Sequence, residues 1–87
     1  MVERIKQTEI LLEFLENYEN EEIFSSTIIN FCYTTRFLPD NQADVYYLLS
    51  DFVIKEALIK IKNGNYFINK KGLENMKKDL IEWKEQD

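Results

Sequence analysis

The chain has 87 residues, enough for one small domain. A domain of this size buries only about 60% of its unfolded surface, which leaves no spare mass for a deep substrate cleft. A hydrophobic content of 45% and an aromatic content of 14%, with two Gly and one Pro, argue against a disordered chain. Because the formal net charge is −5, nucleic-acid binding would need a local excess of basic residues.

Cys32 is the one cysteine, and the chain has no histidine. One cysteine cannot form an internal disulfide, which suits a reducing compartment, and a structural zinc site is close to excluded. No apolar run approaches the roughly 18 residues of a membrane span, and the N-terminal residues lack a signal-type apolar stretch. We therefore expect a cytoplasmic protein with no metal, no cofactor and no membrane partner.

The first predicted helix covers residues 3–18, and its apolar residues recur at three and four positions. They are Ile10, Leu11, Phe14, Leu15 and Tyr18. A short β-like piece follows at residues 22–25, and Ser25 or Ser26 offers a hydroxyl to cap a second helix. That helix carries Ile28, Ile29, Cys32 and Tyr33 on its apolar side. It should stop near Phe37, because Pro39 disfavours helical geometry at the residue before it.

The third predicted helix, capped by Asp40 or Asn41, has the clearest pattern in the chain. Its apolar residues follow the i, i+3, i+4, i+7, i+8 spacing of one helical face without a miss. They are Val45, Leu48, Leu49, Phe52 and Val53.

After Ala57 the apolar period changes from helical to two, which predicts a β-hairpin. Asn63-Gly64 favours a two-residue type I′ turn, because that turn needs positive φ at both central residues. The turn predicts that Ile61 faces Tyr66 and that Ile59 faces Ile68, all on one side. Lys60, Lys62, Asn65 and Phe67 then share the other side.

Asn69 can cap a last helix over residues 70–85. Leu73, Met76, Leu80 and Trp83 form a narrow apolar seam along it. Such a seam can pack back on its own domain or join two copies. We expect a homodimer through these four residues.

The order helix, strand, helix, helix, hairpin, helix resembles a winged helix-turn-helix domain, a mainly α fold with a small β-hairpin (α+β). The specific part is residues 45–72, which is similar to the third helix and wing of the bacterial PadR and MarR regulator families. Those families close the wing with Tyr-x-Leu-Thr-x-x-Gly. Here the closing piece reads Tyr66-Phe67-Ile68-Asn69-Lys70-Lys71-Gly72, with Asn69 in place of the usual Thr or Ser.

The resemblance implies that the third helix enters the DNA major groove and that the wing touches the neighbouring backbone. At 100° per residue, Tyr47, Ser50 and Ile54 lie opposite the apolar face, with Asp44 and Asp51 on one flank and Gln42 near the start. Gln42, Tyr47 and Ser50 could then touch bases. Exposed Tyr47 and Ile54 also suit a protein contact, or packing on the first helix or on a dimer mate.

The charges of the chain are unevenly distributed. Residues 57–72 carry four lysines and no acid, whereas residues 1–24 carry seven acids and two bases. We call Lys60, Lys62, Lys70 and Lys71 the basic island. With Lys55 at the end of the third helix, it is consistent with binding the nucleic-acid backbone. The other interpretation is that edge lysines prevent strands of two molecules from pairing.

Two hypotheses follow, neither of them an enzyme. In the first, the protein is a DNA-binding transcriptional regulator or DNA-associated accessory factor that binds double-stranded DNA through the third helix and the lysine-rich wing. In the second, it is an acidic protein-binding module, such as a phage or mobile-element inhibitor of a host nucleic-acid enzyme. Its contact residues would be Glu13, Glu16, Asp44, Asp51 and Ile54.

Overall fold

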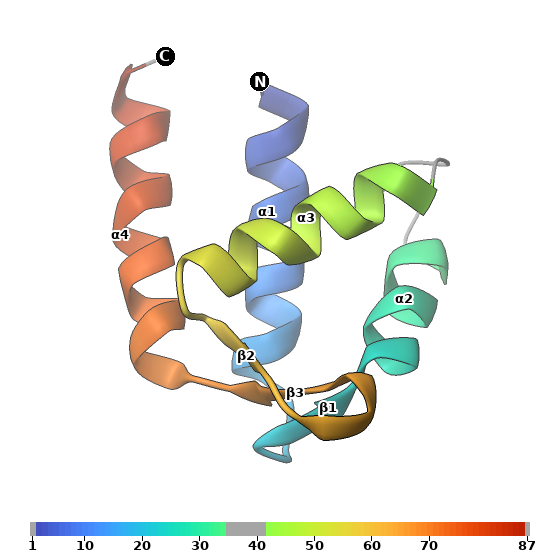
Figure 1. The fold of residues 1–87 in the computed structure, drawn as a ribbon. Coiled ribbons are helices and arrows are strands. Elements are labelled where there is room, and N and C mark those ends of the chain that lie inside the picture. Colours follow the sequence, from blue (N-terminus) through green and yellow to red (C-terminus); the bar gives the residue numbers. More distant parts are fainter. Residues whose placement is uncertain (1, 35–41, 87) are drawn as a thin grey trace.

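The computed structural model describes residues 2–34 and 42–86, and the side chains of residues 5–34 and 45–85. These ranges form an α+β fold, the class that the sequence predicts, with four α-helices and one antiparallel sheet in which a third strand joins the predicted hairpin (Figure 1). The helices are α1 (Val2–Glu16), α2 (Ser25–Thr34), α3 (Gln42–Ile54) and α4 (Lys70–Gln86). The strands are β1 (Glu22–Phe24), β2 (Leu58–Lys60) and β3 (Asn65–Ile68).

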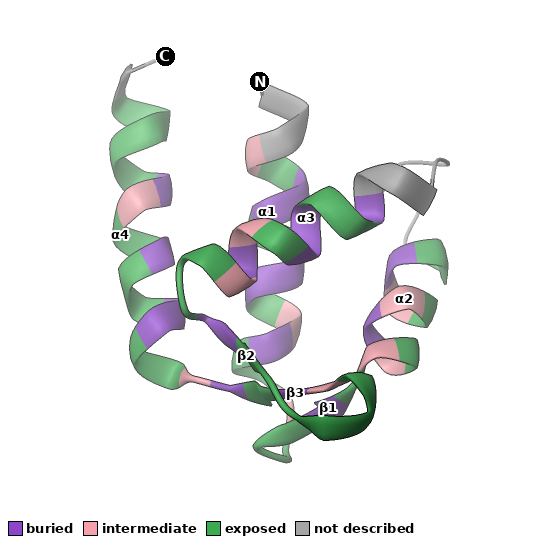
Figure 2. Ribbon diagram, in the orientation of Figure 1, coloured by how far each residue is buried: buried purple, intermediate pink, exposed green. Residues whose placement is uncertain are grey.

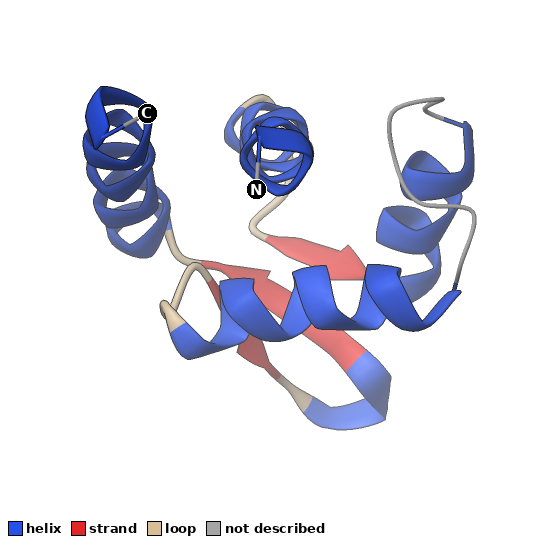
Figure 3. Cartoon of the chain, turned by 90° about the horizontal axis from the view of Figure 1, so that it is seen from above, coloured by secondary structure: helices blue, strands red, loops and turns tan. Residues whose placement is uncertain are grey.

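The helices lie on one side of the sheet, above it in Figure 1. Seen from above, α1 stands between α4 and α2, and α3 crosses in front of it (Figure 3). The first helix ends at Glu16, just before Asn17, whose amide group bonds back to the Glu13 carbonyl at 2.9 Å. The expected stop of α2 near Phe37 and the caps at Asp40 or Asn41 lie outside the described residues.

The sheet has the order β1-β3-β2, so the short strand before α2 joins the hairpin along β3. Ile23 of β1 pairs with Tyr66, and Leu58 of β2 pairs with Ile68. The inner face of the sheet therefore presents Ile23, Leu58, Tyr66 and Ile68, all of them buried.

The predicted hairpin register is wrong by one residue. Ile59 pairs with Phe67 and not with Ile68, and the Ile61 amide bonds to the Asn65 carbonyl at 2.9 Å. Asn63 and Gly64 do take the positive φ values that the turn requires, at 72° and 76°. The loop, however, includes a third residue, Lys62. Because a slip of one residue turns every side chain of a strand to its other face, Ile59 and Ile61 point outward.

The core lies between the helices and the inner face of the sheet (Figure 2). Every helix and strand contributes to it: the buried apolar residues are Leu11, Leu12, Leu15, Ile23, Ile28, Cys32, Val45, Leu48, Leu49, Phe52, Ala57, Leu58, Tyr66, Ile68, Leu73, Met76 and Leu80. The predicted apolar face of α3 is confirmed, with four residues buried and Val53 half-buried.

The seam of α4 faces α1 of the same chain. Leu73, Met76 and Leu80 are at most 3% exposed within the chain, while Trp83 near the end of the helix is 39% exposed. Three of the four seam residues therefore pack against their own domain, which is one of the two alternatives that the sequence left open. A dimer through α4 would have to use its outer side chains.

Candidate nucleic-acid interface

The basic island lies at the hairpin and at the start of α4. Lys60 lies on β2, Lys62 in the turn, and Lys70 and Lys71 in the first turn of α4, and all four are exposed. None of them forms an ion pair with a residue that the structure describes. Their charges are therefore not neutralised by a described neighbour.

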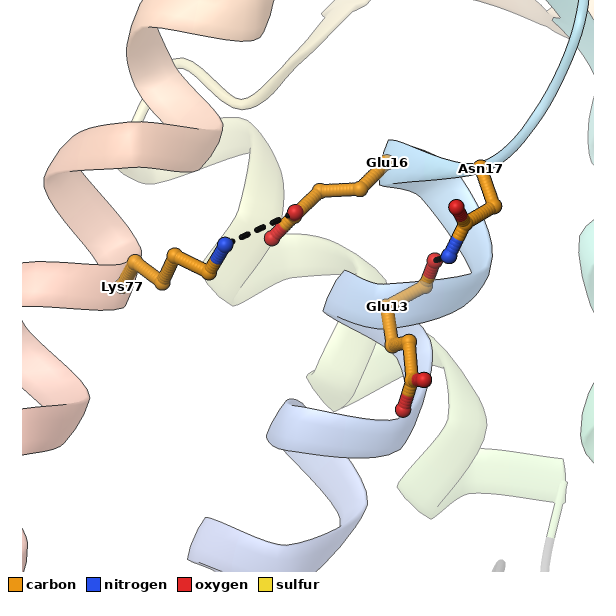
Figure 4. A network of polar contacts seen from close by, with 4 residues as sticks. All are labelled: Glu13, Glu16, Asn17 and Lys77. Atoms are coloured by element: carbon orange, nitrogen blue, oxygen red, sulfur yellow. Dashed lines mark hydrogen bonds and ion pairs between the residues drawn. The ribbon is translucent and has the colours of Figure 1, made fainter.

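Three other lysines differ in this respect, whereas Lys78 of α4 is exposed and, like the basic island, forms no ion pair with a described residue. Lys77 bonds to the Glu16 carboxylate at 2.8 Å (Figure 4). Lys84 bonds to Glu9 at 2.6 Å, so both lysines connect α4 to α1. Lys55, predicted to contact DNA, instead bonds to Asp79 of α4 at 3.2 Å. Partly exposed pairs of this kind contribute little stability, but they direct the lysine toward an acid of the same chain.

Lys70 and Lys71 border an acidic loop. A groove of about 370 Å³ between the α1–β1 connection and the start of α4 is lined by both lysines and by Glu19, Glu21 and Phe67 among others. The two glutamates lower the positive potential at this end of the basic island. Lys60 and Lys62, at the hairpin, are thus the best placed to hold phosphates.

The outer face of α3 is polar and aromatic, as its helical period predicts. Tyr47 is 64% exposed, Ser50 is exposed, and Ile54 at 74% is the most exposed large apolar side chain of the described part. Asp51 is half-buried. The side chains of Gln42 and Asp44, also predicted contact residues, lie outside the described ones.

Tyr46 joins α3 to the hairpin, and the sequence analysis missed it. Burial, and then the nearby Tyr46, raise the pKa of the Tyr66 hydroxyl, which shows that α3 lies close to β3 at this point. Lys60 is the cross-strand partner of Tyr66. Lys60 therefore lies on the side of the sheet that faces α3. Tyr46 is 50% exposed, and the signal for it in the sequence was its position next to Val45, at the edge of the apolar face of α3.

The residues of the acidic alternative do not share one environment. Glu16 is engaged by Lys77, whereas the exposed Glu13 side chain makes no ion pair with a described residue (Figure 4). Glu13 borders a shallow groove of about 350 Å³ walled by Phe14, Tyr18 and Phe31. The rings of Phe14 and Phe31 are stacked, with centroids 4.0 Å apart.

Cys32 is buried among apolar side chains of α2 and the core. Burial raises the pKa of its thiol to about 11, so the thiol stays protonated and weakly nucleophilic at neutral pH. Among residues 2–34 and 42–86, no cluster of three His, Cys, Asp or Glu side chains could hold a metal ion. None of the helices in these ranges is both long and apolar enough to cross a membrane.

Comparison with known proteins gives no match: no family model, no curated protein and no solved structure is significantly similar to the chain.

Proposed function

We propose that this protein binds double-stranded DNA as a winged helix-turn-helix domain, in the role of a transcriptional regulator or a DNA-associated accessory factor. The hairpin lysines would hold phosphates, and the outer face of α3, with Tyr47 and Ser50, would lie along the groove. The observation that carries the proposal is the contrast among lysines. Lys60 and Lys62 are exposed without a described acidic partner, whereas Lys55, Lys77 and Lys84 are each paired.

Two further features support this proposal. The observed elements follow the order helix, strand, helix, helix, hairpin, helix that the PadR-like and MarR-like resemblance implies. The cross-strand pair of Lys60 with Tyr66, and the proximity of Tyr66 to Tyr46, put Lys60 on the side of the sheet that faces α3. A duplex lying along α3 would therefore meet Lys60 at the same time.

The test is fluorescence anisotropy with a labelled duplex over a range of salt concentrations from about 50 to 200 mM. We expect binding at low salt that weakens steeply as salt rises, because bound phosphates release counterions. Lys60→Ala/Lys62→Ala should weaken binding and lower the salt slope by about 1.8, about 0.9 for each lost phosphate contact. The matched control is Lys77→Ala/Lys84→Ala, which removes two paired lysines and should leave the slope nearly unchanged. Absence of binding to any duplex at low salt would end this proposal.

A second candidate function is binding to a basic protein through the acidic side of the chain. The observation in its favour is on α3, where Tyr47 and Ile54 are the two most exposed large apolar side chains of the described part of the chain. Under this proposal, Ile54→Lys and Glu13→Lys abolish capture of a protein partner, while Lys60→Ala/Lys62→Ala does not. Affinity capture that retrieves only nucleic acid would argue against it.

A further inference from the structure

Glu13 differs from its acidic neighbours on α1, because its carboxylate has no cation beside it. Glu9 bonds to Lys84 of α4 at 2.6 Å. Glu16 bonds to Lys77 of the same helix at 2.8 Å. Glu13 is exposed and forms no ion pair with a described residue, and Figure 4 shows its carboxylate pointing away from the bonded Lys77 and Glu16. A partner molecule could therefore bring a cation to Glu13 without breaking an existing contact.

The groove beside Glu13 lies between the C-terminal half of α1 and the helix α2. It has a volume of about 350 Å³ and is open to solvent. Its lining residues are Ile10, Glu13, Phe14, Asn17, Tyr18 and Phe31. Among these described residues Glu13 brings the one charge, and none is basic. The groove therefore has a negative charge at its rim and apolar walls.

Three aromatic side chains form most of these walls. The rings of Phe14 and Phe31 stack with centroids 4.0 Å apart, and the ring of Tyr18 is tilted against Phe14 at 5.7 Å. All three rings are half-buried against the core, so each keeps part of its surface in contact with solvent. Because the stack joins α1 to α2, it holds the two walls at a fixed distance, and the groove is formed before any ligand binds.

Asn17 adds a hydrogen-bond acceptor beside Glu13. Its side-chain nitrogen donates to the Glu13 backbone carbonyl at 2.9 Å, which fixes the orientation of the amide group. The amide oxygen has no hydrogen bond from a described residue. The polar side of the groove thus consists of the carboxylate and an amide oxygen, and both of these groups accept hydrogen bonds.

Acceptors beside aromatic rings favour a cation that also has an apolar part. A neutral apolar ligand would take water from the Glu13 carboxylate without replacing its hydrogen bonds, and an anion would be repelled. An arginine side chain avoids both costs. Its guanidinium group is weakly hydrated, stacks on aromatic rings and can donate two parallel hydrogen bonds to one carboxylate. Its methylene groups can cover the apolar walls. The ammonium group of lysine is strongly hydrated and fits such walls less well.

We propose that this groove binds an arginine side chain from a basic segment of a partner protein. The proposal deepens the second candidate function and rests on it, because it names the groove and the side chain through which a basic partner is recognised. One arginine in an exposed groove binds weakly, with a dissociation constant on the order of 1 mM. The basic island takes no part in this contact.

The experiment is a titration of the isotope-labelled protein with three short peptides, followed through its backbone amide NMR signals. The first peptide repeats Ala-Leu-Arg three times. The second has lysine at each arginine position, and the third has citrulline, which keeps the shape of arginine without its charge. The arginine peptide should shift the signals of Glu13, Asn17 and Phe31. It should bind at least about fivefold more tightly than the citrulline peptide, and more tightly than the lysine peptide.

Two variants test the two parts of the groove. Glu13→Gln removes the charge and should weaken binding of the arginine peptide about tenfold. Glu82→Gln is the matched control, because Glu82 is exposed on α4, forms no ion pair with a described residue and receives the same change. It should bind like the wild type. Phe31→Leu removes one ring and should reduce the preference for arginine over lysine. Circular dichroism checks that each variant is folded, and Tyr18→Leu replaces Phe31→Leu should the latter unfold.

The titration separates this proposal from the function on which it rests. Signals around the groove that do not move at peptide concentrations of about 10 mM overturn the proposal, as does equal binding of the arginine and citrulline peptides. Binding that Glu13→Gln leaves intact also overturns it. A protein that fails in this titration but still captures a partner that Ile54→Lys abolishes binds that partner through α3, and then the groove alone is excluded.

Discussion

Gly72 of α4 lies directly against the backbone of Glu56, at the end of α3. A Cβ atom on Gly72 would overlap the Glu56 carbonyl and would lie 2.6 Å from the Ala57 nitrogen. Asn69 fixes the same junction, because its side-chain amide donates to the Glu56 carbonyl and its backbone amide donates to the Ala57 carbonyl, both at 2.9 Å. The first turn of α4 can approach the end of α3 this closely only with glycine at position 72.

Gly72→Ala should therefore destabilise the fold by about 2–4 kcal/mol, because the added methyl group meets backbone atoms that cannot rotate away. Urea unfolding followed by circular dichroism measures this change. Gly64→Ala is the control, since the nearest atom to its Cβ would be the Ser25 hydroxyl at 4.0 Å. It should cost only about 1–2 kcal/mol, from the positive φ of 76°. Equal costs at the two glycines would contradict the close approach.

Glu56 itself occupies a position that favours glycine. Its φ is 62°, and the amides of Glu56 and Ala57 bond to the carbonyls of Val53 and Phe52. This pair of bonds is the Schellman motif, whose left-handed residue is usually glycine.

Glu56→Gly should stabilise the protein by roughly 0.5–1 kcal/mol, because it relieves the side-chain strain at positive φ at a smaller cost in chain entropy. Glu74→Gly, at an exposed position within α4, should instead destabilise by about 1 kcal/mol. The melting temperatures of the two variants, compared with that of the wild type, test both expectations. A lower melting temperature for Glu56→Gly would show that the side chain contributes more than its conformation costs.

The helices could be predicted from the sequence because each buries one face with a regular period. The exception is α1, where the predicted stripe omitted Leu12, which is only 2% exposed. The helix stands between α4 and α2, so it buries a wider face than a surface helix does (Figure 3). Ile10 and Phe14, at the edge of that face, are only half-buried. The apolar period of a single helix does not predict how many other elements will pack against that helix.

For the candidate site, too, local features could be predicted and contacts between elements could not. The sequence pattern predicted that the basic island is exposed, because lysines on a hairpin and in a first helical turn are rarely buried. The pairing of Lys55 with Asp79 did not follow, because it joins two helices whose relative position the tertiary fold decides. The Asn-Gly turn predicted where the chain reverses, but the register depended on Leu58, which is 1% exposed beneath the sheet. Burying Leu58 outweighed the preference for a two-residue loop.

Stability should fall in alkaline solution because of Cys32. The unfolded thiol ionises from about pH 9, but burial delays ionisation in the folded protein to about pH 11. Between these values the unfolded state holds fewer protons, so the free energy of unfolding falls as pH rises, by on the order of 2 kcal/mol. Below pH 9 Cys32 contributes no pH dependence. Urea unfolding at several pH values measures the loss.

The control for this prediction is Cys32→Ala, which removes the titrating group. Its stability should decline less between pH 9 and 11, with the remaining loss confined to the upper part of the window, where the tyrosine of the unfolded chain ionises before the buried Tyr66 does. The raised pKa of Tyr66 has the same sign and acts only above the ordinary tyrosine value of about 10. Identical slopes for Cys32→Ala and the wild type would show that the buried thiol is not the cause.

The hairpin register makes opposite predictions for two adjacent residues. Leu58 is 1% exposed and pairs with Ile68 on the inner face, whereas Ile59 is 44% exposed and pairs with Phe67 on the outer face. Leu58→Ala should therefore cost about 2–4 kcal/mol, through lost burial and the cavity left behind. Ile59→Ala should cost less than about 1 kcal/mol. In the alternative register, which a two-residue turn would give, Ile59 would be buried, and Ile59→Ala would cost more than Leu58→Ala. Urea unfolding of the two variants distinguishes the two registers, since a larger loss for Ile59→Ala than for Leu58→Ala is expected only if Ile59 faces the core.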